Sequence, residues 1–210
     1  MSTRDYFDFD EIDNAIDNLE MVAHFLNSTF AFKWKWVCIA LYQSLYGLAI
    51  AALGGNDPRQ TVYDKSRNEG KAIALHANGI PDSVIASCFG VSEKQVGKWL
   101  ASPWLISFDE ALCRVQKQAN LPPYDNVKPL TLSDSEKRSI KKVSKEFRNE
   151  FEHFSPKRWA IDLSGSSKIV KDVLRVICFI ALDSNCLTMS NTQEKKLKAA
   201  LLKIKGIIGR

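Results

Sequence analysis

The sequence predicts an all-α protein, on three observations. Apolar residues recur at spacings of three and four over several long segments, the pattern of a helix with one buried face. Sustained alternation of apolar and polar residues, which is typical of strands, is limited to a short run at residues 159–163. Of the 210 residues, 45% are hydrophobic and 25% are charged, which indicates a globular chain and not a disordered one.

The amino-terminal part predicts a hairpin of two long helices. Apolar residues follow helical spacing over residues 12–32 and again over 33–53, and the turn-forming residues 54–58 end the pair. The stretch 36–53 is strongly apolar, but it contains Gln43, Ser44 and two tyrosines. We therefore expect a buried helix and no membrane span. The first residues lack an apolar signal core, so we expect the cytoplasm as the location.

The second half of the chain predicts further helices with defined ends. Ser133 and Glu136 have the spacing of a capping box at a helix start, and Pro156 disfavours helical backbone at the preceding residue. Pro122 and Pro123 stop the helix before them. The expected helices cover residues 107–119, 133–153 and 166–183, followed by a lysine-rich amphipathic tail helix in the last twenty residues.

The five cysteines favour free thiols. They are odd in number and have no short paired spacing, and most lie in apolar helical runs, so we expect buried thiols in a reducing compartment (Cys38, Cys88, Cys113, Cys178 and Cys186). The chain also lacks a metal-ligand cluster and a glycine-rich phosphate loop. We therefore expect no metal and no cofactor.

Residues 82–100 have the spacing of a helix-turn-helix. Ala86 is small enough for two helices to cross closely, and Gly90 can supply the turn. Apolar residues fill the space between the helices (Ile85, Phe89, Val91, Val96 and Trp99). As a DNA reader, the second helix offers four exposed contact residues (Ser92, Lys94, Gln95 and Lys98). The alternative is a compact insertion that braces the main domain or meets a protein partner.

Arg148 and His153 have the chemistry of metal-free RNA cleavage. Histidine can transfer a proton near neutral pH, and arginine can hold a phosphate through two parallel hydrogen bonds. Five positions separate the residues, which places them about 140° apart around one helix. One helix therefore cannot aim both at a small target, whereas two copies related by a two-fold axis can surround one cleft.

The run of Arg148, Asn149, three further residues and His153 resembles the motif of the HEPN family. The order of helices over residues 8–53 and 107–183 is similar to that family's bundle. The resemblance implies a homodimer with a composite site and metal-independent endoribonuclease activity through attack of the RNA 2′-hydroxyl. It also implies toxin–antitoxin, phage-defence or other antiviral systems, with an antitoxin or defence-complex protein as a further partner. Arg148 and His153 would be catalytic, and Asn149 would orient one of them or the phosphate.

This interpretation divides the chain into three parts. Residues 1–55 and 105–186 would form a discontinuous HEPN-like helical bundle, residues 56–104 a helix-turn-helix insertion, and residues 187–210 a basic tail helix. The net charge is +5, and bases outnumber acids over residues 133–158. On charge and position we expect Lys145, Lys157 and Arg158 to contact RNA.

Other interpretations of the same residues stay open. Arg148 could pair with Glu152 four positions on, while His153 caps the end of its helix. The chain would then be a noncatalytic HEPN-like binding module. A DNA-binding regulator that acts through residues 82–100 and a scaffold protein are further alternatives, and the basic segment is equally compatible with a solvated helix face.

Overall fold

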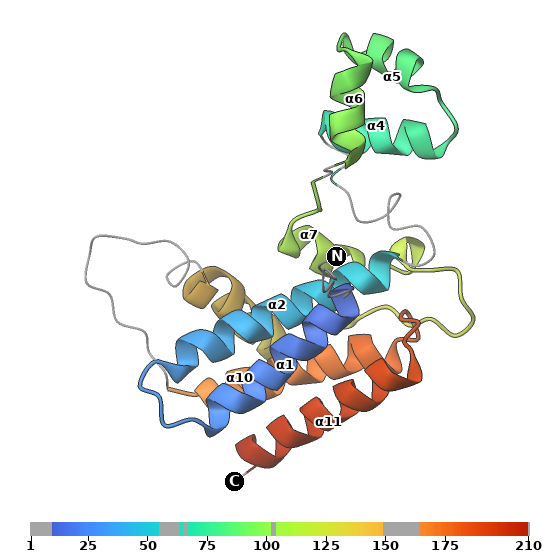
Figure 1. The fold of residues 1–210 in the computed structure, drawn as a ribbon. Helices are drawn as coiled ribbons and strands as arrows, with labels where there is room; N and C mark the ends of the chain where they lie inside the picture. The colour runs from blue at the N-terminus through green and yellow to red at the C-terminus, as the bar shows by residue number, and fades with distance from the viewer. Residues whose placement is uncertain (1–9, 55–63, 65–66, 102–103, 149–163, 210) are drawn as a thin grey trace, which may run out of the picture.

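The computed structural model describes residues 10–54, 64, 67–101, 104–148 and 164–209. These residues form helices and connecting turns without a strand element, which confirms the all-α prediction (Figure 1). The α-helices are α1 (Glu11–Asn27), α2 (Lys33–Gly54), α4 (Asn68–Ala77), α5 (Asp82–Phe89), α6 (Glu93–Ala101), α7 (Phe108–Arg114), α8 (Asp134–Lys141), α10 (Ser166–Cys178) and α11 (Asn191–Ile208). Three short elements accompany them: a 3₁₀ turn η1 (Gln118–Asn120) and two π-helical turns, η2 (Lys142–Phe147) and η3 (Phe179–Asp183).

The α1–α2 hairpin forms as expected, but α1 ends at Asn27 and not at residue 32, so residues 28–32 connect the two helices. The Asp13 N–H donates to Asp10 Oδ1 at 2.8 Å, and the two residues complete a capping box that fixes the start of α1. The helices approach closely because Gly47 has no side chain. A Cβ built there would lie 3.2 Å from the Glu11 carbonyl oxygen.

Helix α2 is the central helix of the bundle. It is long and apolar enough to cross a membrane by length and composition, but 72% of its apolar stretch is buried inside the protein. It packs against α1, α7, η2 and α10. The burial of α2 agrees with the buried helix that the sequence predicts.

Helix α11 belongs to the same core. Ser190 and Gln193 form a capping box at its start, and α11 packs along α1 (Figure 1). Leu197, Leu201 and Ile204 are buried in the main hydrophobic cluster with residues of α1, α2 and α10. The lysine-rich segment is therefore helical as expected, and its apolar stripe lies inside the bundle while its lysines face solvent.

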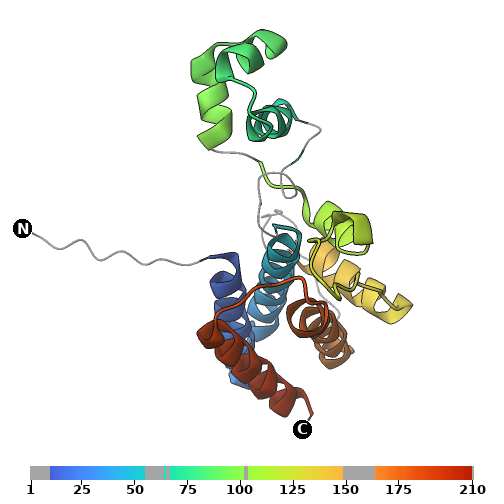
Figure 2. The ribbon, with the colours of Figure 1, turned by 90° about the vertical axis from the view of Figure 1, so that its right-hand side faces the viewer.

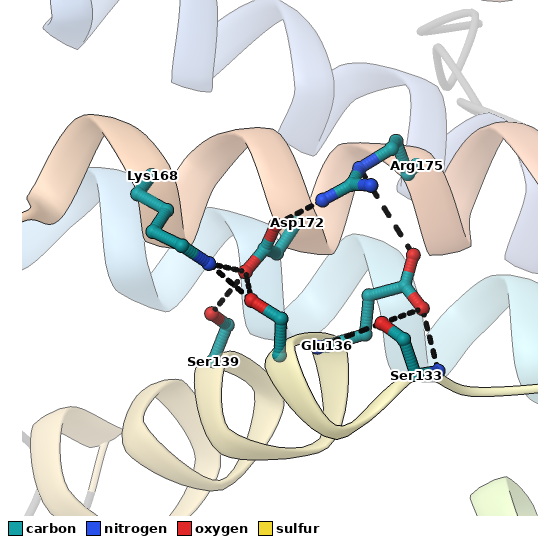
Figure 3. Close-up of polar contacts among 7 residues, drawn as sticks. Ser133, Glu136, Ser139, Lys168, Asp172 and Arg175 are labelled. Atoms are coloured by element: carbon teal, nitrogen blue, oxygen red, sulfur yellow. Dashed lines mark hydrogen bonds and ion pairs between the residues drawn. The ribbon is translucent and has the colours of Figure 1, made fainter.

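Asp172 joins α10 to α8 through a buried polar network (Figure 3). Its side chain is 1% exposed and accepts hydrogen bonds from Ser135 Oγ at 2.7 Å and Ser139 Oγ at 2.8 Å. Lys168 Nζ donates to the same carboxylate at 2.7 Å, and Arg175 pairs with its other oxygen. Burial raises the pKa of Asp172, but the hydrogen bonds outweigh burial and hold the pKa well below its usual range. The network fixes the α8 backbone from which η2 continues.

Helices α4, α5 and α6 pack around a hydrophobic cluster of their own (Figures 1 and 2). Ala72, Ile85, Ala86 and Val96 form its buried centre, and the other apolar residues expected there, Phe89, Val91 and Trp99, pack against them. Both views show the three helices standing apart from the bundle. At their base, the Asp64 N–H donates to the Trp104 carbonyl oxygen at 3.0 Å, and Arg67 lies over the Trp104 ring at 4.8 Å.

Candidate functional site

A π-helical turn immediately precedes the first residue of the Arg–His motif. Helix α8 is continuous with η2, where the Arg148 N–H donates to the Val143 carbonyl oxygen five positions earlier. Such wide turns are rare and often occur at functional sites. Val143, Ser144 and Phe147 are buried against the bundle, while Arg148 follows at the end of the turn and is partly exposed. The turn therefore leaves the Arg148 side chain at the surface of a packed helix.

The aromatic ring of Tyr42 lies beneath the Arg148 guanidinium. The guanidinium carbon is 5.1 Å from the ring centroid, within the range of a cation–π interaction. Tyr42 is 7% exposed and lies 4.8 Å from the Phe108 ring, centroid to centroid, so its position is fixed by packing. A guanidinium held over a fixed ring keeps its charge, and the contact limits its motion.

Arg148 lines a cavity of about 310 Å³ between α2, α7 and η2. Two further polar groups of the cavity are already engaged. The Tyr46 hydroxyl donates to the Ile106 carbonyl oxygen, and Lys145 forms an ion pair with Asp109. Burial raises the pKa of Tyr46, its neighbour Tyr42 raises it further, and the nearby Arg148 charge offsets part of the rise. Tyr46 therefore stays a neutral hydrogen-bonding group at neutral pH.

The structure brings two of the predicted site residues together. Arg148 and Lys145 both line this cavity. The other predicted catalytic residues, Asn149 and His153, lie outside the described residues, as do the predicted RNA contacts Lys157 and Arg158. The end of the motif helix, which the sequence predicts near His153, also lies outside the described residues. The described part of the site is therefore an arginine and a lysine beside an aromatic wall.

The sequence does not predict the residues of that wall. Tyr42, Tyr46 and Phe108 come from segments that the sequence predicts only as helices. The two tyrosines are four positions apart in α2, so both lie on one face. Two tyrosines on one face of an apolar helix are the feature of the sequence that could have indicated this wall. Nothing in the sequence marks Asp109 as the partner of Lys145.

The predicted DNA contacts lie on α6 and, for Ser92, at the residue immediately before it. Ser92, Lys94 and Lys98 are exposed and Gln95 is partly exposed. The Ser92 hydroxyl oxygen accepts the Gln95 N–H at 3.3 Å, so Ser92 also caps the helix. The turn before it is a Schellman motif, in which Gly90 has φ +64° and the Val91 N–H donates to the Ala86 carbonyl oxygen at 3.0 Å.

The cysteines divide into two groups. Cys38 and Cys186 are buried and Cys178 is partly buried, but Cys88 and Cys113 are exposed. The expectation of buried thiols was therefore wrong for these last two, because each lies on the solvent side of its short helix. Burial raises the pKa of Cys38 to about 12. Among the described residues, no group of three or more histidine, cysteine, aspartate or glutamate side chains is placed to hold a metal ion.

Comparisons with protein-family models, with curated proteins and with solved structures find no match for this chain. The resemblance of the Arg–His segment to HEPN proteins thus rests on the motif and on the helix order. A function for this chain therefore has to be inferred from its own residues.

Proposed function

We propose that this protein is a metal-independent endoribonuclease of the HEPN type, acting in the cytoplasm as a homodimer. The observation that carries the proposal is the placement of Arg148. It begins the motif, follows a π-helical turn and is held over Tyr42 at the edge of a cavity that also contains Lys145. An arginine placed in this way is suited to binding a phosphate that carries growing negative charge.

The proposed reaction is an internal phosphoryl transfer. A base removes the proton of the RNA 2′-hydroxyl, and the 2′-oxygen forms a bond to the adjacent phosphorus. The bond from phosphorus to the 5′-oxygen breaks, and an acid protonates that oxygen as it leaves. The products are a 2′,3′-cyclic phosphate and a 5′-hydroxyl. His153 carries the proton transfer, Arg148 stabilises the phosphorane charge, and Asn149 orients the phosphate, as the motif implies.

In this proposal, the second copy of the chain supplies part of the active site. On an ideal helix, the side chains of Arg148 and His153 point in different directions. The histidine that acts with one Arg148 therefore comes from the second copy of the motif in the same cleft, which the partner subunit supplies. A homodimer supplies two arginines and two histidines across its axis. A protein of the same defence system, such as an antitoxin, would restrain the activity by covering that cleft.

The test is incubation of the purified protein with total RNA and tRNA in the presence of a chelator, beside Arg148→Ala and His153→Ala. We expect fragments with 2′,3′-cyclic phosphate ends from the parent protein alone. Both variants must retain the parent's circular dichroism and oligomeric state for the comparison to hold. Cleavage that survives either substitution contradicts the proposal. Intact RNA from a folded, dimeric parent would instead favour a noncatalytic binding module.

A second candidate function is DNA binding by α4, α5 and α6. The observation that favours it is the exposed polar face of α6, presented by helices with a hydrophobic cluster of their own. The charge is modest, since residues 67–101 contain four basic and three acidic side chains. Salt-sensitive binding of duplex DNA that is lost in Lys94→Ala with Lys98→Ala would support this function. Unchanged binding in that double variant would argue against it.

A further inference from the structure

We propose that the trough between α7 and the continuous α8–η2 helix binds the nucleotides that flank the cleaved bond of a single-stranded RNA. This inference rests on the proposed ribonuclease function and adds to it the form of the substrate and its path to Arg148. It follows from two adjoining cavities, from the order of the cations along them and from an ion pair that crosses between them.

The trough is made of two cavities that share a wall. The cavity beside Arg148 measures about 310 Å³, and a second cavity of about 240 Å³ lies next to it along α7. Four residues line both cavities (Phe108, Asp109, Ser144 and Lys145). Shared lining residues make the two hollows adjoining parts of one surface depression, so a ligand longer than one nucleotide can occupy both.

Basic side chains line the trough in sequence order. Lys137, Lys141 and Lys145 are spaced four positions apart along the α8–η2 helix, and Arg148 follows at its end. Residues four apart lie on the same face of a helix. The three lysines are exposed, and each lines the second cavity. A row of cations that leads to the proposed catalytic arginine fits a polyanionic strand whose phosphates repeat along its length.

The ion pairs of this row are weak enough for phosphates to replace them. Lys137 Nζ lies 3.5 Å from Asp134 Oδ1, but the two side chains are 58% and 83% exposed. Lys141 has no ion pair among the described residues. Exposed pairs of this kind contribute little stability, because water screens the charges and ordering the side chains costs entropy.

The inner wall of the trough suits bases better than it suits a duplex. Apolar side chains line the second cavity together with the lysines (Phe108, Leu112, Leu132 and Ile140). Single-stranded nucleic acids bind to grooves that combine cations for the backbone with apolar or aromatic surfaces for the base faces. In a duplex the base faces are stacked inside the helix and cannot reach such a wall. The arrangement therefore favours an unpaired strand.

The ion pair between Asp109 and Lys145 stands where the two cavities meet. Both side chains are about half exposed, so the pair opens at small cost. A bound phosphate would have to take Lys145 from Asp109 and would meet the remaining carboxylate charge. Asp109 therefore lowers the affinity of the trough for RNA, and its neutralisation as Asp109→Asn should raise that affinity.

The test measures binding of a fluorescent single-stranded RNA of about 12 nucleotides to the full chain across a series of salt concentrations. All proteins carry His153→Ala so that the probe stays intact. Lys137→Ala with Lys141→Ala should weaken binding and reduce the slope of log K against log salt by about 1.4, because each phosphate contact in a single strand contributes about 0.7. The matched control, Lys195→Ala with Lys196→Ala, removes the same charge from the exposed face of α11 and should leave the slope unchanged.

Three results would overturn the inference. They are an equal loss of slope in the α11 control, no change of slope in the α8 pair, and equally tight binding of a duplex of the same length. Asp109→Asn should bind the probe several-fold more tightly, and weaker binding would count against the path through Lys145. Cleavage assays on the chain with His153 separate the two proposals. If the parent cleaves RNA but the salt slope does not change in Lys137→Ala with Lys141→Ala, only the proposal of the trough is wrong. If that slope falls but no RNA is cleaved, only the proposed ribonuclease function is wrong.

Discussion

The guanidinium carbon of Arg148 lies 5.1 Å from the centroid of the Tyr42 ring, across the contact between η2 and α2. Tyr42 is buried and Arg148 is partly exposed, so the ring acts as a fixed support for a group that can still meet a ligand. This contact joins the motif segment to the most buried helix of the bundle. It implies that the position of the proposed phosphate-binding group depends on the core.

Replacement of Tyr42 tests this positioning role. Tyr42→Leu should lower RNA cleavage by about 2- to 30-fold, since a cation–π contact contributes roughly 0.5–2 kcal/mol. Tyr42→Phe keeps the aromatic face and should retain most of the activity. Initial cleavage rates and thermal melting would be measured together. Equal losses in both variants would mean that the Tyr42 hydroxyl matters and the aromatic face does not. A loss that simply follows the melting temperature would mean that Tyr42 has only a packing role.

Neutralising Asp172 should destabilise the bundle near neutral pH. Asp172→Asn removes the negative charge and one of the two oxygens that bind two hydroxyls and two cations, and we expect a loss of about 1–3 kcal/mol in the free energy of unfolding. Because the pKa of Asp172 is lowered in the folded protein, its contribution is fully present above the unfolded pKa of about 3.9 and is lost as the pH falls below it.

Urea denaturation at several pH values measures this contribution. The difference between the parent and Asp172→Asn should be large at pH 7 and should shrink as the pH falls below about 4. Asp183→Asn is the matched control, because Asp183 is exposed on η3 nearby and should have little effect at any pH. A difference that grows at low pH would contradict the assignment of the lowered pKa.

Two glycines of the α4–α6 unit should respond in opposite directions to alanine. Gly90 has φ +64°, so Gly90→Ala should destabilise the unit by about 1–2 kcal/mol although no atom lies within 4 Å of the new Cβ. Gly97 lies inside α6 with equally open space, so Gly97→Ala should stabilise it by roughly 1 kcal/mol. Hydrogen exchange of the amides in α5 and α6 would report both changes. Similar effects of the two substitutions would show that backbone conformation does not decide stability here.

The five thiols should differ in their reaction with iodoacetamide under native conditions at pH 8. Cys88 and Cys113 are exposed and should react first, whereas Cys38 should react last because it is buried and its pKa is raised to about 12. Peptide mass spectrometry over time gives the order. Unfolding in urea should make all five react at similar rates. Early labelling of Cys38 in the folded protein would contradict its burial.

Much of the helix order follows from local sequence. The capping boxes at Ser133 and Ser190 form as hydrogen bonds between residues three positions apart, so their geometry depends on few neighbours. Gly90 ends α5 because glycine adopts a left-handed conformation at little cost. The apolar spacing that predicts α1 and α10 is likewise a local feature of the sequence. Arg148 was identified because its motif is contiguous in sequence.

The wall of the site depends on contacts between distant segments. Tyr42 and Arg148 meet only because α2 packs on η2, and Asp109 meets Lys145 only because α7 lies beside the same helix. The π-helical turn of η2 has no counterpart in the spacing, since Ile140, Val143, Ser144 and Phe147 also fit an α-helix. Pairings of this kind depend on which helix faces become neighbours in the bundle.

The sequence by itself determined an all-α chain, the capped start of α8 at Ser133, the turn at Gly90 and the identity of Arg148 as a candidate phosphate ligand. These features depend on hydrogen bonds and conformational preferences that act over a few residues. The tertiary structure alone decided that α11 joins the core, that Tyr42 supports Arg148 and that Asp172 links α10 to α8. Burial of apolar faces decides these contacts, because it depends on the whole set of helices and favours whichever arrangement removes the most apolar surface from water.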